Sequence, residues 1–336
     1  MKGSHRIIVE SRKVKYDFTI KRNITILTGE SGSGKTVLIE LIRDYRRYGS
    51  DSGVLVSCDR DCRTIDNEDW ERQISEVSDS IIFIDEGNRF LTSKRFAEIV
   101  QKSDNYFVIA TREKLQMLPY SVKEIYGFRK SGKFHEPRQT YNEIYHLYGE
   151  ISEQSIIRPK YVLTEDSNSG YEFFSELSKE SNIGCAAANG KSNIISSLEK
   201  MDKKEKTGLI IVDGAAFGSE MRDVSEYLKE VGGIVLYAPE SFEWLLLSTD
   251  LIPGIRVSQI LEHPEDYIDS REYASWERFF TALLVSRTQG DPLWSYSKKK
   301  LPDVYFSSKV MNAVKKQMKL IVWEKKERKV NSCPST

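Results

Sequence analysis

The sequence has no long hydrophobic run and no net charge. Although 39% of its 336 residues are hydrophobic, none of its apolar segments reaches the roughly 18 to 20 residues that a membrane-spanning helix needs. The composition therefore excludes a membrane-spanning protein and still provides apolar side chains for folded cores. The first residues lead into an alternating segment without the apolar stretch of a secretory signal, so we expect a cytoplasmic protein.

Cysteine is scarce and the charges are balanced. Because 50 basic and 50 acidic residues cancel, no overall field attracts nucleic acid, and such binding would need a local patch. The four cysteines, Cys58, Cys62, Cys185 and Cys333, are scattered without a second close pair or a histidine cluster. Their spacing supports neither a zinc site nor a disulfide framework. The sequence also lacks short repeats and low-complexity tracts, which excludes solenoids and disordered scaffolds.

The first half of the chain alternates between strand-like and helix-like segments. Residues 6–20 alternate apolar and polar side chains around a polar centre, which predicts a hairpin-like pair of strands. Beyond it, buried strands are predicted near residues 24–28, 54–57, 81–85 and 106–110, and helices near 35–47, 69–77 and 93–102. This order predicts an α/β fold with a doubly wound sheet.

A glycine-rich octapeptide, residues 29–36, matches the phosphate-loop pattern GxxxxGK(S/T) between a predicted strand and a predicted helix. Its glycines allow backbone N–H groups and the helix N-terminus to hold phosphate oxygens. Lys35 would reach the β and γ phosphates, and the Thr36 hydroxyl would coordinate Mg²⁺. The predicted nucleotide-binding residues are Gly29, Ser31, Gly32, Ser33, Gly34, Lys35 and Thr36.

Two acidic residues, Asp85 and Glu86, follow an apolar strand in a way that resembles a Walker B element. In such an element, Asp85 would hold Mg²⁺ through water and Glu86 would orient the attacking water. After the next strand, Thr111 and Arg112 either sense the γ-phosphate or simply end the strand.

These motifs together resemble P-loop ATPases of the broad AAA or ABC-like kind, without the LSGGQ signature of ABC proteins. The resemblance implies ATP and Mg²⁺ as cofactors, with Lys35 and Glu86 as catalytic residues. The adenine base follows from the resemblance alone, since the chain has no motif specific for adenine and no NKxD motif for guanine.

Aromatic and basic residues are interleaved between residues 124 and 148. They either stack on bases and neutralise phosphates of a nucleic acid, or they form a hairpin or a domain-joining surface. The set comprises Tyr126, Phe128, Arg129, Lys130, Lys133, Phe134, His135, Arg138, Tyr141, Tyr145, His146 and Tyr148. The polar residues 149–155 resemble a linker, so we place the P-loop ATPase domain at residues 1–157.

A second α/β domain is predicted over residues 158–250, followed by a C-terminal helical extension with a basic tail over residues 251–336. Strands are expected at 160–164, 209–212 and 234–237, and helices around 171–177, 189–201 and 220–231. Glu165 and Asp213 follow the first two of these strands. Because open α/β sheets gather their sites at the carboxyl ends of the strands, we expect these two carboxylates to lie together.

This second domain resembles a Toprim domain, the metal-binding α/β fold of topoisomerases, primases and OLD-type nucleases. The resemblance rests on Glu165, Asp213, the basic turn 190–193 and the segment 237–247. It implies that Glu165 and Asp213 are catalytic and hold Mg²⁺ or Mn²⁺.

The chain departs from the Toprim pattern at two positions. Ala215 stands where a second aspartate belongs, and Ser169 occupies a later acidic position. Either other carboxylates compensate, or the fold binds a partner or nucleic acid without catalysis. The candidates for compensation are Asp166, Glu240 and Glu243.

The C-terminal segment is cationic, and its apolar residues recur at helical spacings. We expect a helix that packs one face on the core, while its basic face either contacts phosphates or is solvated. The basic residues are Lys298, Lys299, Lys300, Lys309, Lys315, Lys316, Lys319, Lys325, Lys326, Arg328 and Lys329.

The sequence thus favours an ATP-hydrolysing enzyme whose nucleotide state controls a Toprim-like, nucleic-acid-processing domain. Proteins of this combination suggest a role in antiphage defence or in a mobile element. The alternative is a regulatory ATPase whose second domain is a non-catalytic binding module. A small-molecule kinase would need an acceptor pocket and a lid arginine pair that the sequence does not reveal.

We expect a homo-oligomer or a partner protein, because many P-loop ATPases complete their sites across subunits.

Overall fold

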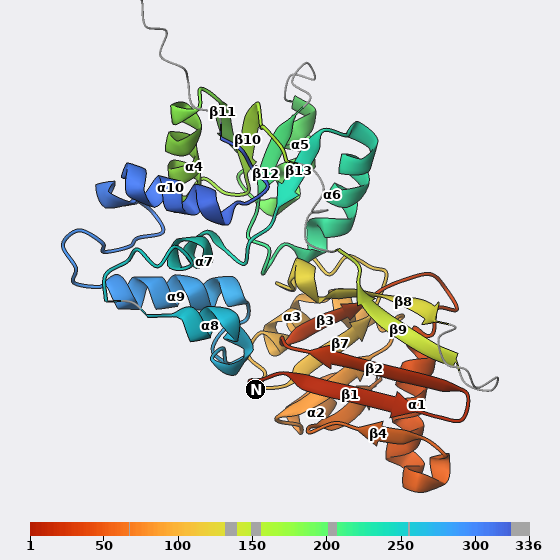
Figure 1. Cartoon of the computed structure of the whole chain (residues 1–336). Coiled ribbons are helices and arrows are strands. Elements are labelled where there is room, and N and C mark those ends of the chain that lie inside the picture. Colours follow the sequence, from red (N-terminus) through yellow and green to blue (C-terminus); the bar gives the residue numbers. More distant parts are fainter. Residues whose placement is uncertain (67, 132–139, 149–155, 201–206, 255, 324–336) are drawn as a thin grey trace, which may run out of the picture. The chain divides into compact units, whose positions relative to one another are not determined.

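The protein consists of two compact units, each assembled from more than one stretch of chain (Figure 1). The computed structural model describes residues 1–66, 68–131, 140–148, 156–200, 207–254 and 256–323. The first unit comprises Met1–Glu150, Asp213–Arg222 and Arg256–Ala282, and the second comprises Ile151–Val212, Asp223–Ile255 and Leu283–Thr336. Both units are α/β, which confirms the coarse fold class, while the P-loop and Toprim-like assignments stay predictions.

The first unit is built on a mixed nine-stranded sheet with the order β4-β1-β2-β9-β8-β3-β7-β6-β5. The strands from β8 to β5 in this order are parallel, whereas β1 runs antiparallel to β2 and β4, and β8 runs antiparallel to β9. The strands are β1 (His5–Glu10), β2 (Val14–Ile20), β3 (Ile24–Leu27), β4 (Leu55–Ser57), β5 (Asp61–Ile65), β6 (Ser80–Ile84), β7 (Tyr106–Ala110), β8 (Ile125–Ser131) and β9 (Thr140–His146).

Helices pack on both faces of the parallel part of this sheet. On one face, α1 (Lys35–Tyr48) buries Leu38, Ile39 and Ile42, and on the other, α3 (Lys94–Val100) buries Phe96 and Val100. Strands covered on both faces are nearly continuous hydrophobic runs, and β3, β6 and β7 are buried at every position with only Thr25 and Ser80 polar, so they are recognisable in the sequence. The other helices of this unit are α2 (Trp70–Ser75), α8 (Ser258–Glu262), the start of α6 (Gly218–Val231) and the first half of α9 (Trp276–Thr288).

The sheet curls so that its two edges meet. Its edge strands β4 and β5 are joined by only three residues, 58–60, and four Cα steps span at most about 15 Å. In a flat sheet of nine strands the edges would lie roughly 38 Å apart. Consistent with the curl, the His5 ring of β1 packs edge-on against Tyr106 of β7 with centroids 5.4 Å apart. Side chains from both walls of the curl pack with those of α1 in one core cluster.

The strand predictions for the first unit are largely confirmed, with two exceptions. The hairpin at 6–20 forms as β1 and β2, and the strands near 24–28, 81–85 and 106–110 form as β3, β6 and β7. The segment 54–57 is a strand, as predicted. The prediction that it belongs to the doubly wound, parallel strands is wrong, because β4 pairs antiparallel with β1. Strand β5 was not predicted, since this edge strand carries exposed and charged residues that hide its pattern.

A buried ion pair attaches residues 256–282 to the rest of the first unit. The Arg22 guanidinium lies 3.5 Å from the Glu124 carboxylate, with side chains only 7% and 4% exposed. The same guanidinium stacks 3.5 Å over the Trp276 ring. Beside it, Asn23 donates a 3.1 Å hydrogen bond to the Ala274 carbonyl. Three non-contiguous stretches therefore meet at Arg22.

The second attached segment, residues 213–222, packs on the loop that follows β7. Gly218 donates a hydrogen bond of 2.8 Å to the carbonyl of Tyr120, and a Cβ at Gly218 would lie 2.6 Å from the same carbonyl oxygen. Lys114 pairs with Glu220, and Arg222 donates a 2.8 Å hydrogen bond to the carbonyl of Arg112. Only glycine at position 218 allows this close approach.

The second unit contains a four-stranded parallel sheet with the order β11-β10-β12-β13. Its strands are β10 (Tyr161–Thr164), β11 (Gly184–Ala187), β12 (Gly208–Ile211) and β13 (Ile234–Tyr237), and its helices include α4 (Ser169–Glu180), α5 (Ile194–Lys200), α7 (Phe242–Leu247) and α10 (Ser308–Gln317). The strands expected at 160–164, 209–212 and 234–237 are confirmed. Strand β11 was not predicted because Gly-Cys-Ala-Ala has no β-branched or aromatic residue.

The expected C-terminal helix is confirmed as α10, which buries Val310, Met311 and Val314. The basic residues Lys325, Lys326, Arg328 and Lys329 lie outside the described residues, as do the linker 149–155 and the expected helix end at Met201. Within the described ranges, no helix is long and apolar enough to cross a membrane.

We predict that Glu124→Ala strongly destabilises the first unit. The substitution leaves the buried Arg22 guanidinium without its carboxylate, which typically costs about 3–5 kcal/mol. Urea unfolding followed by tryptophan fluorescence measures the change. The control is Arg271→Ala in the same attached segment, where Arg271 is exposed and pairs with Asp104 at 2.7 Å. That exposed pair should contribute less than about 1 kcal/mol, and equal losses in the two variants would contradict the prediction.

Candidate nucleotide site

The predicted phosphate loop connects β3 to α1 in the parallel part of the curled sheet. At its start, Thr28 donates a 2.8 Å hydrogen bond to the Tyr126 carbonyl of β8, so the loop begins from a fixed backbone. At its end, Gly34 has a φ of 113° and its carbonyl accepts the 3.0 Å hydrogen bond from Leu38 that opens α1. The helix N-terminus thereby presents its first N–H groups at the loop, as an anion site requires.

Lys35 is the first residue of α1, and its side chain folds back onto the phosphate loop. Its side-chain amine donates to the carbonyls of Gly29 and Glu30 at 2.7 and 3.1 Å and to the Ser33 hydroxyl at 3.3 Å. Burial is the largest influence on the pKa of Lys35 and lowers it, while Glu86 and Asp85 oppose the shift and Arg112 adds to it. A desolvated cation inside a glycine-rich loop interacts strongly with a phosphate, because little water screens the charge.

The structure brings Thr36 and Asp85 together from different elements. Asp85 follows β6, and β7 lies between β6 and β3 in the sheet. The Thr36 hydroxyl donates to the Asp85 carboxylate at 3.4 Å. A hydroxyl and one carboxylate fit Mg²⁺, which is commonly held by one or two carboxylates together with substrate phosphates and water. These residues therefore suit an ion that arrives with a nucleotide.

Glu86 and Arg112 form an ion pair beside these groups. Arg112 follows β7 and donates to Glu86 Oε1 at 3.1 Å. The other oxygen, Glu86 Oε2, is buried and accepts no hydrogen bond from any residue that the structure describes. Thr111, the neighbouring candidate, is buried, and its hydroxyl accepts a 2.9 Å hydrogen bond from the Glu113 amide. Of the two, Arg112 lies against the acidic pair and Thr111 stabilises a turn.

Sequence reasoning missed two residues that support the loop, Tyr16 on β2 and Asn142 on β9. They are register partners in the parallel pairing of the two strands, and both are buried. The Tyr16 hydroxyl donates to the Gly34 carbonyl at 2.9 Å. Burial raises the pKa of Tyr16, and a hydrogen bond with Asn142 opposes that shift. The alternating pattern of β2 indicated that Tyr16 is buried, but no local signal showed that it reaches Gly34.

The two Toprim-like carboxylates belong to different units. Glu165 follows β10 in the second unit, where its amide donates to the Ile211 carbonyl at 3.0 Å. Asp213 is the first residue of the segment 213–222 in the first unit. Among the described residues, no group of three or more His, Cys, Asp or Glu side chains is arranged to hold a metal ion. The metal site at Glu165 and Asp213 remains a prediction.

Two of the carboxylates considered for compensation have structural roles in the second unit. Asp166 accepts hydrogen bonds from the amide and side chain of Asn168 at 3.2 and 2.6 Å. Glu243 is buried and accepts a 2.7 Å hydrogen bond from the Tyr296 hydroxyl, which lies 2.7 Å from that of Ser169. Asp166 therefore stabilises a local turn, and Glu243 belongs to the buried core of the unit.

The aromatic and basic segment near residues 124–148 contains a strand pair, as the hairpin alternative expects, and its stacking on nucleic acid stays a prediction. Strands β8 and β9 are antiparallel, and Arg129 lies 4.9 Å from the centre of the Tyr145 ring. Arg129 also lies 3.4 Å from the Glu143 carboxylate. Lys133, Phe134, His135 and Arg138 fall outside the described residues.

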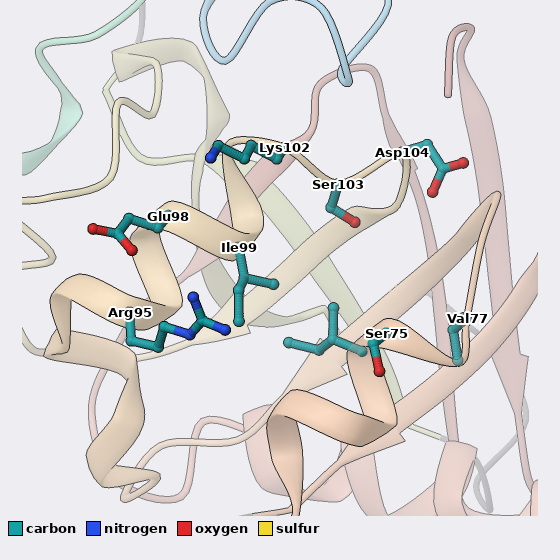
Figure 2. A pocket seen from close by; sticks show the side chains of 9 residues that line it. Ser75, Val77, Arg95, Glu98, Ile99, Lys102, Ser103 and Asp104 are labelled. Carbon is teal, nitrogen blue, oxygen red and sulfur yellow. The ribbon is translucent and has the colours of Figure 1, made fainter.

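A separate cavity of about 300 Å³ lies near the ends of α2 and α3 (Figure 2). Three of its charged lining residues have partners, since Arg95 pairs with Glu71 at 2.9 Å, Glu98 with Lys94 at 3.8 Å and Asp104 with Arg271 at 2.7 Å. No residue of the phosphate loop lines this cavity. We assign it no part in nucleotide binding.

We predict that Gly34→Ala damages the loop more than Gly32→Ala. Both glycines have positive φ, 113° and 78°, so either alanine costs about 1–2 kcal/mol in backbone strain. At Gly34, the new Cβ would also lie 2.8 Å from Asn142 Nδ2 and 3.0 Å from the Tyr16 hydroxyl, whereas nothing lies within 4 Å at Gly32. Urea unfolding should therefore show a larger loss for Gly34→Ala, and equal losses would disprove the support by Tyr16 and Asn142.

Neither a scan against protein-family models nor a search of curated proteins found a match to this chain. The interpretation of the site therefore depends on its residues and their geometry.

Proposed function

We propose that the protein is a cytosolic ATPase whose site lies at the phosphate loop of the first unit. The supporting observation is the convergence of side chains from two segments: the Thr36 hydroxyl donates to Asp85 at 3.4 Å, and the charges of Glu86 and Asp85 oppose the lowering of the Lys35 pKa by burial. The sequence motif provides residue types suited to binding phosphate and Mg²⁺. The contact between Thr36 and Asp85 supports the proposal that they act in one site. Adenine as the base follows from the resemblance to P-loop ATPases.

The proposed reaction assigns a separate task to each residue. The loop amides and Lys35 bind the phosphates, so that several hydrogen-bond donors stabilise their negative charge. Thr36 and Asp85 would hold Mg²⁺, which would supply positive charge to neutralise the phosphates. Glu86 orients the attacking water through an oxygen such as Oε2, which accepts no hydrogen bond within the described part of the chain.

We further propose that the second unit processes or binds nucleic acid under control of the nucleotide state. In its sheet the strand order reverses between β10 and β12, the first and third strands of the unit. Open α/β sheets bind ligands beyond the carboxyl ends of the strands at such a reversal, and Glu165 directly follows β10. A non-catalytic binding module, serving a partner protein or a second copy of the chain, is the alternative.

The ATPase proposal predicts different defects in two variants. Lys35→Ala removes a buried charged donor, and we expect MgATP binding to weaken about 10- to 100-fold. Glu86→Gln keeps the shape of the side chain but not its charge, so binding should persist while turnover falls about 10²- to 10⁴-fold. Calorimetric titration and phosphate release measure the two effects, with EDTA as the metal control. Absence of MgATP binding and hydrolysis in the unaltered protein would refute the proposal.

The proposal for the second unit predicts metal-dependent cleavage. The full chain is incubated with plasmid, single-stranded DNA and RNA in Mg²⁺ or Mn²⁺, with and without ATP. Cleavage should require both Glu165 and Asp213, so Glu165→Gln and Asp213→Asn should each abolish it and leave ATP binding intact. Binding of these nucleic acids without cleavage would favour the non-catalytic module.

A further inference from the structure

Three consecutive lysines, residues 298–300, lie at the carboxyl edge of the sheet in the second unit. Hydrogen bonds attach this segment to the first turn of α4, the helix that begins beyond the carboxyl end of β10. The Ser169 amide donates to the Lys298 carbonyl at 3.0 Å, and the Leu301 amide donates to the Glu172 carboxylate at 2.8 Å. We call residues 298–300 the lysine triplet.

Buried hydrogen bonds also fix the chain just before the lysine triplet. The Tyr296 hydroxyl donates to Glu243 Oε1 at 2.7 Å and lies 2.7 Å from the Ser169 hydroxyl. None of these three residues is more than 4% exposed. The Tyr296 amide donates to the Thr288 hydroxyl at 2.9 Å. The backbone of the triplet is therefore held on both sides, and Ser169, one of the two departures from the Toprim pattern, takes part in holding it.

The side chains of the lysine triplet, in contrast, reach solvent. Lys299 and Lys300 are exposed, and Lys298 is partly exposed. Neither Lys299 nor Lys300 forms an ion pair with any residue that the structure describes. Adjacent ammonium groups repel one another, and a ligand with several negative charges relieves this repulsion. The triplet is thus a fixed cationic surface that suits a polyanion.

The lysine triplet shares its edge of the sheet with Glu165. Only residues 166–168 separate Glu165 from α4, to which the triplet is bonded. Open α/β sheets bind ligands beyond the carboxyl ends of their strands. A polyanion on the triplet would therefore lie at the edge where such a sheet places its site.

We propose that the lysine triplet binds the phosphodiester backbone of a nucleic acid at this edge. The inference rests on the proposed nucleic-acid role of the second unit and names the residues that make the contact. Lysines bind phosphates without reading the bases, so they position a strand and give no sequence preference. Because the triplet is fixed before binding, less conformational entropy is lost on association.

The composition of the loop favours nucleic acid over a membrane surface. Its exposed residues, Ser297, Lys299 and Lys300, are all polar. Proteins that bind at a membrane interface bury apolar side chains among the lipids in addition to their charged contacts. The loop has no such side chain to insert.

The opposite edge of the same sheet offers a matched pair of lysines. Helix α4 runs from the carboxyl end of β10 back toward the start of β11, which is parallel to β10. Its last residue, Glu180, pairs with Lys315 of α10 at 2.9 Å. Lys316 is next in the chain, Lys319 follows the end of α10, and both are exposed. They carry the same charge as Lys299 and Lys300 away from the carboxyl edge.

Fluorescence anisotropy with labelled duplex DNA, single-stranded DNA and RNA tests the proposal on the full chain. One double variant combines Lys299→Gln with Lys300→Gln, and the control combines Lys316→Gln with Lys319→Gln. Loss of two phosphate contacts should weaken binding at least about tenfold at about 0.1 M salt and reduce the slope of log K against log salt by about 1 to 2. The control should lose less than about threefold, since charges more than about 10 Å from the contact are screened at this salt.

The outcomes separate this inference from the proposed function. If the unaltered chain binds and both double variants lose affinity equally, or neither does, the assignment to the lysine triplet is wrong and the nucleic-acid role stands. If the unaltered chain binds none of the three nucleic acids, both proposals fail. Binding to vesicles of phosphatidylserine and phosphatidylcholine that exceeds binding to nucleic acid and requires Lys299 and Lys300 would overturn the inference. Urea unfolding checks that both variants are folded.

Discussion

The curl of the nine-stranded sheet around α1 is the constraint on which the first unit depends. Three residues connect β4 to β5, and this connection is too short to join the two edges of a flat sheet of nine strands. The curl places β1 and β2 against one side of α1 and β6 and β7 against another, so that all contribute to one core cluster. The helix that carries the phosphate loop is thereby held from several directions.

The same curl explains how distant strands reach the candidate site. In the sheet order, β2 and β9 are separated from β3 by β8, yet Tyr16 of β2 donates to the Gly34 carbonyl at the start of α1. In an open doubly wound sheet these strands would extend away from the loop. Here β2 and β9 pack behind the phosphate loop. Position 34 requires glycine because its φ is 113° and because a Cβ there would clash with Tyr16 and Asn142 of these strands.

The sequence predicted the parts of the site that are local and missed those that depend on long-range pairing. The loop 29–36 and the acidic pair Asp85 and Glu86 are each contiguous, and the strands before them are buried along their whole length and almost entirely apolar. The contribution of Tyr16 and Asn142 depends on the pairing of β2 with β9, which lie more than 100 residues apart. The attachment of residues 213–222 and 256–282 to the first unit likewise depends on tertiary contacts such as Arg22 with Trp276, which leave no periodic pattern.

The loop after β7 connects the candidate site to the segment that leads into the second unit. Arg112 donates to Glu86 through its side chain, and its carbonyl accepts a hydrogen bond from Arg222 in α6. The first residues of α6 belong to the first unit and the rest to the second, so one continuous helix crosses the division. At the candidate site, the charges of Lys35 and Arg112 balance those of Asp85 and Glu86. Phosphates entering this site would compete with Glu86 for Arg112, because both are anions that the guanidinium can bind. Such competition would act on Arg112, whose carbonyl holds the Arg222 side chain at the start of α6 within the first unit.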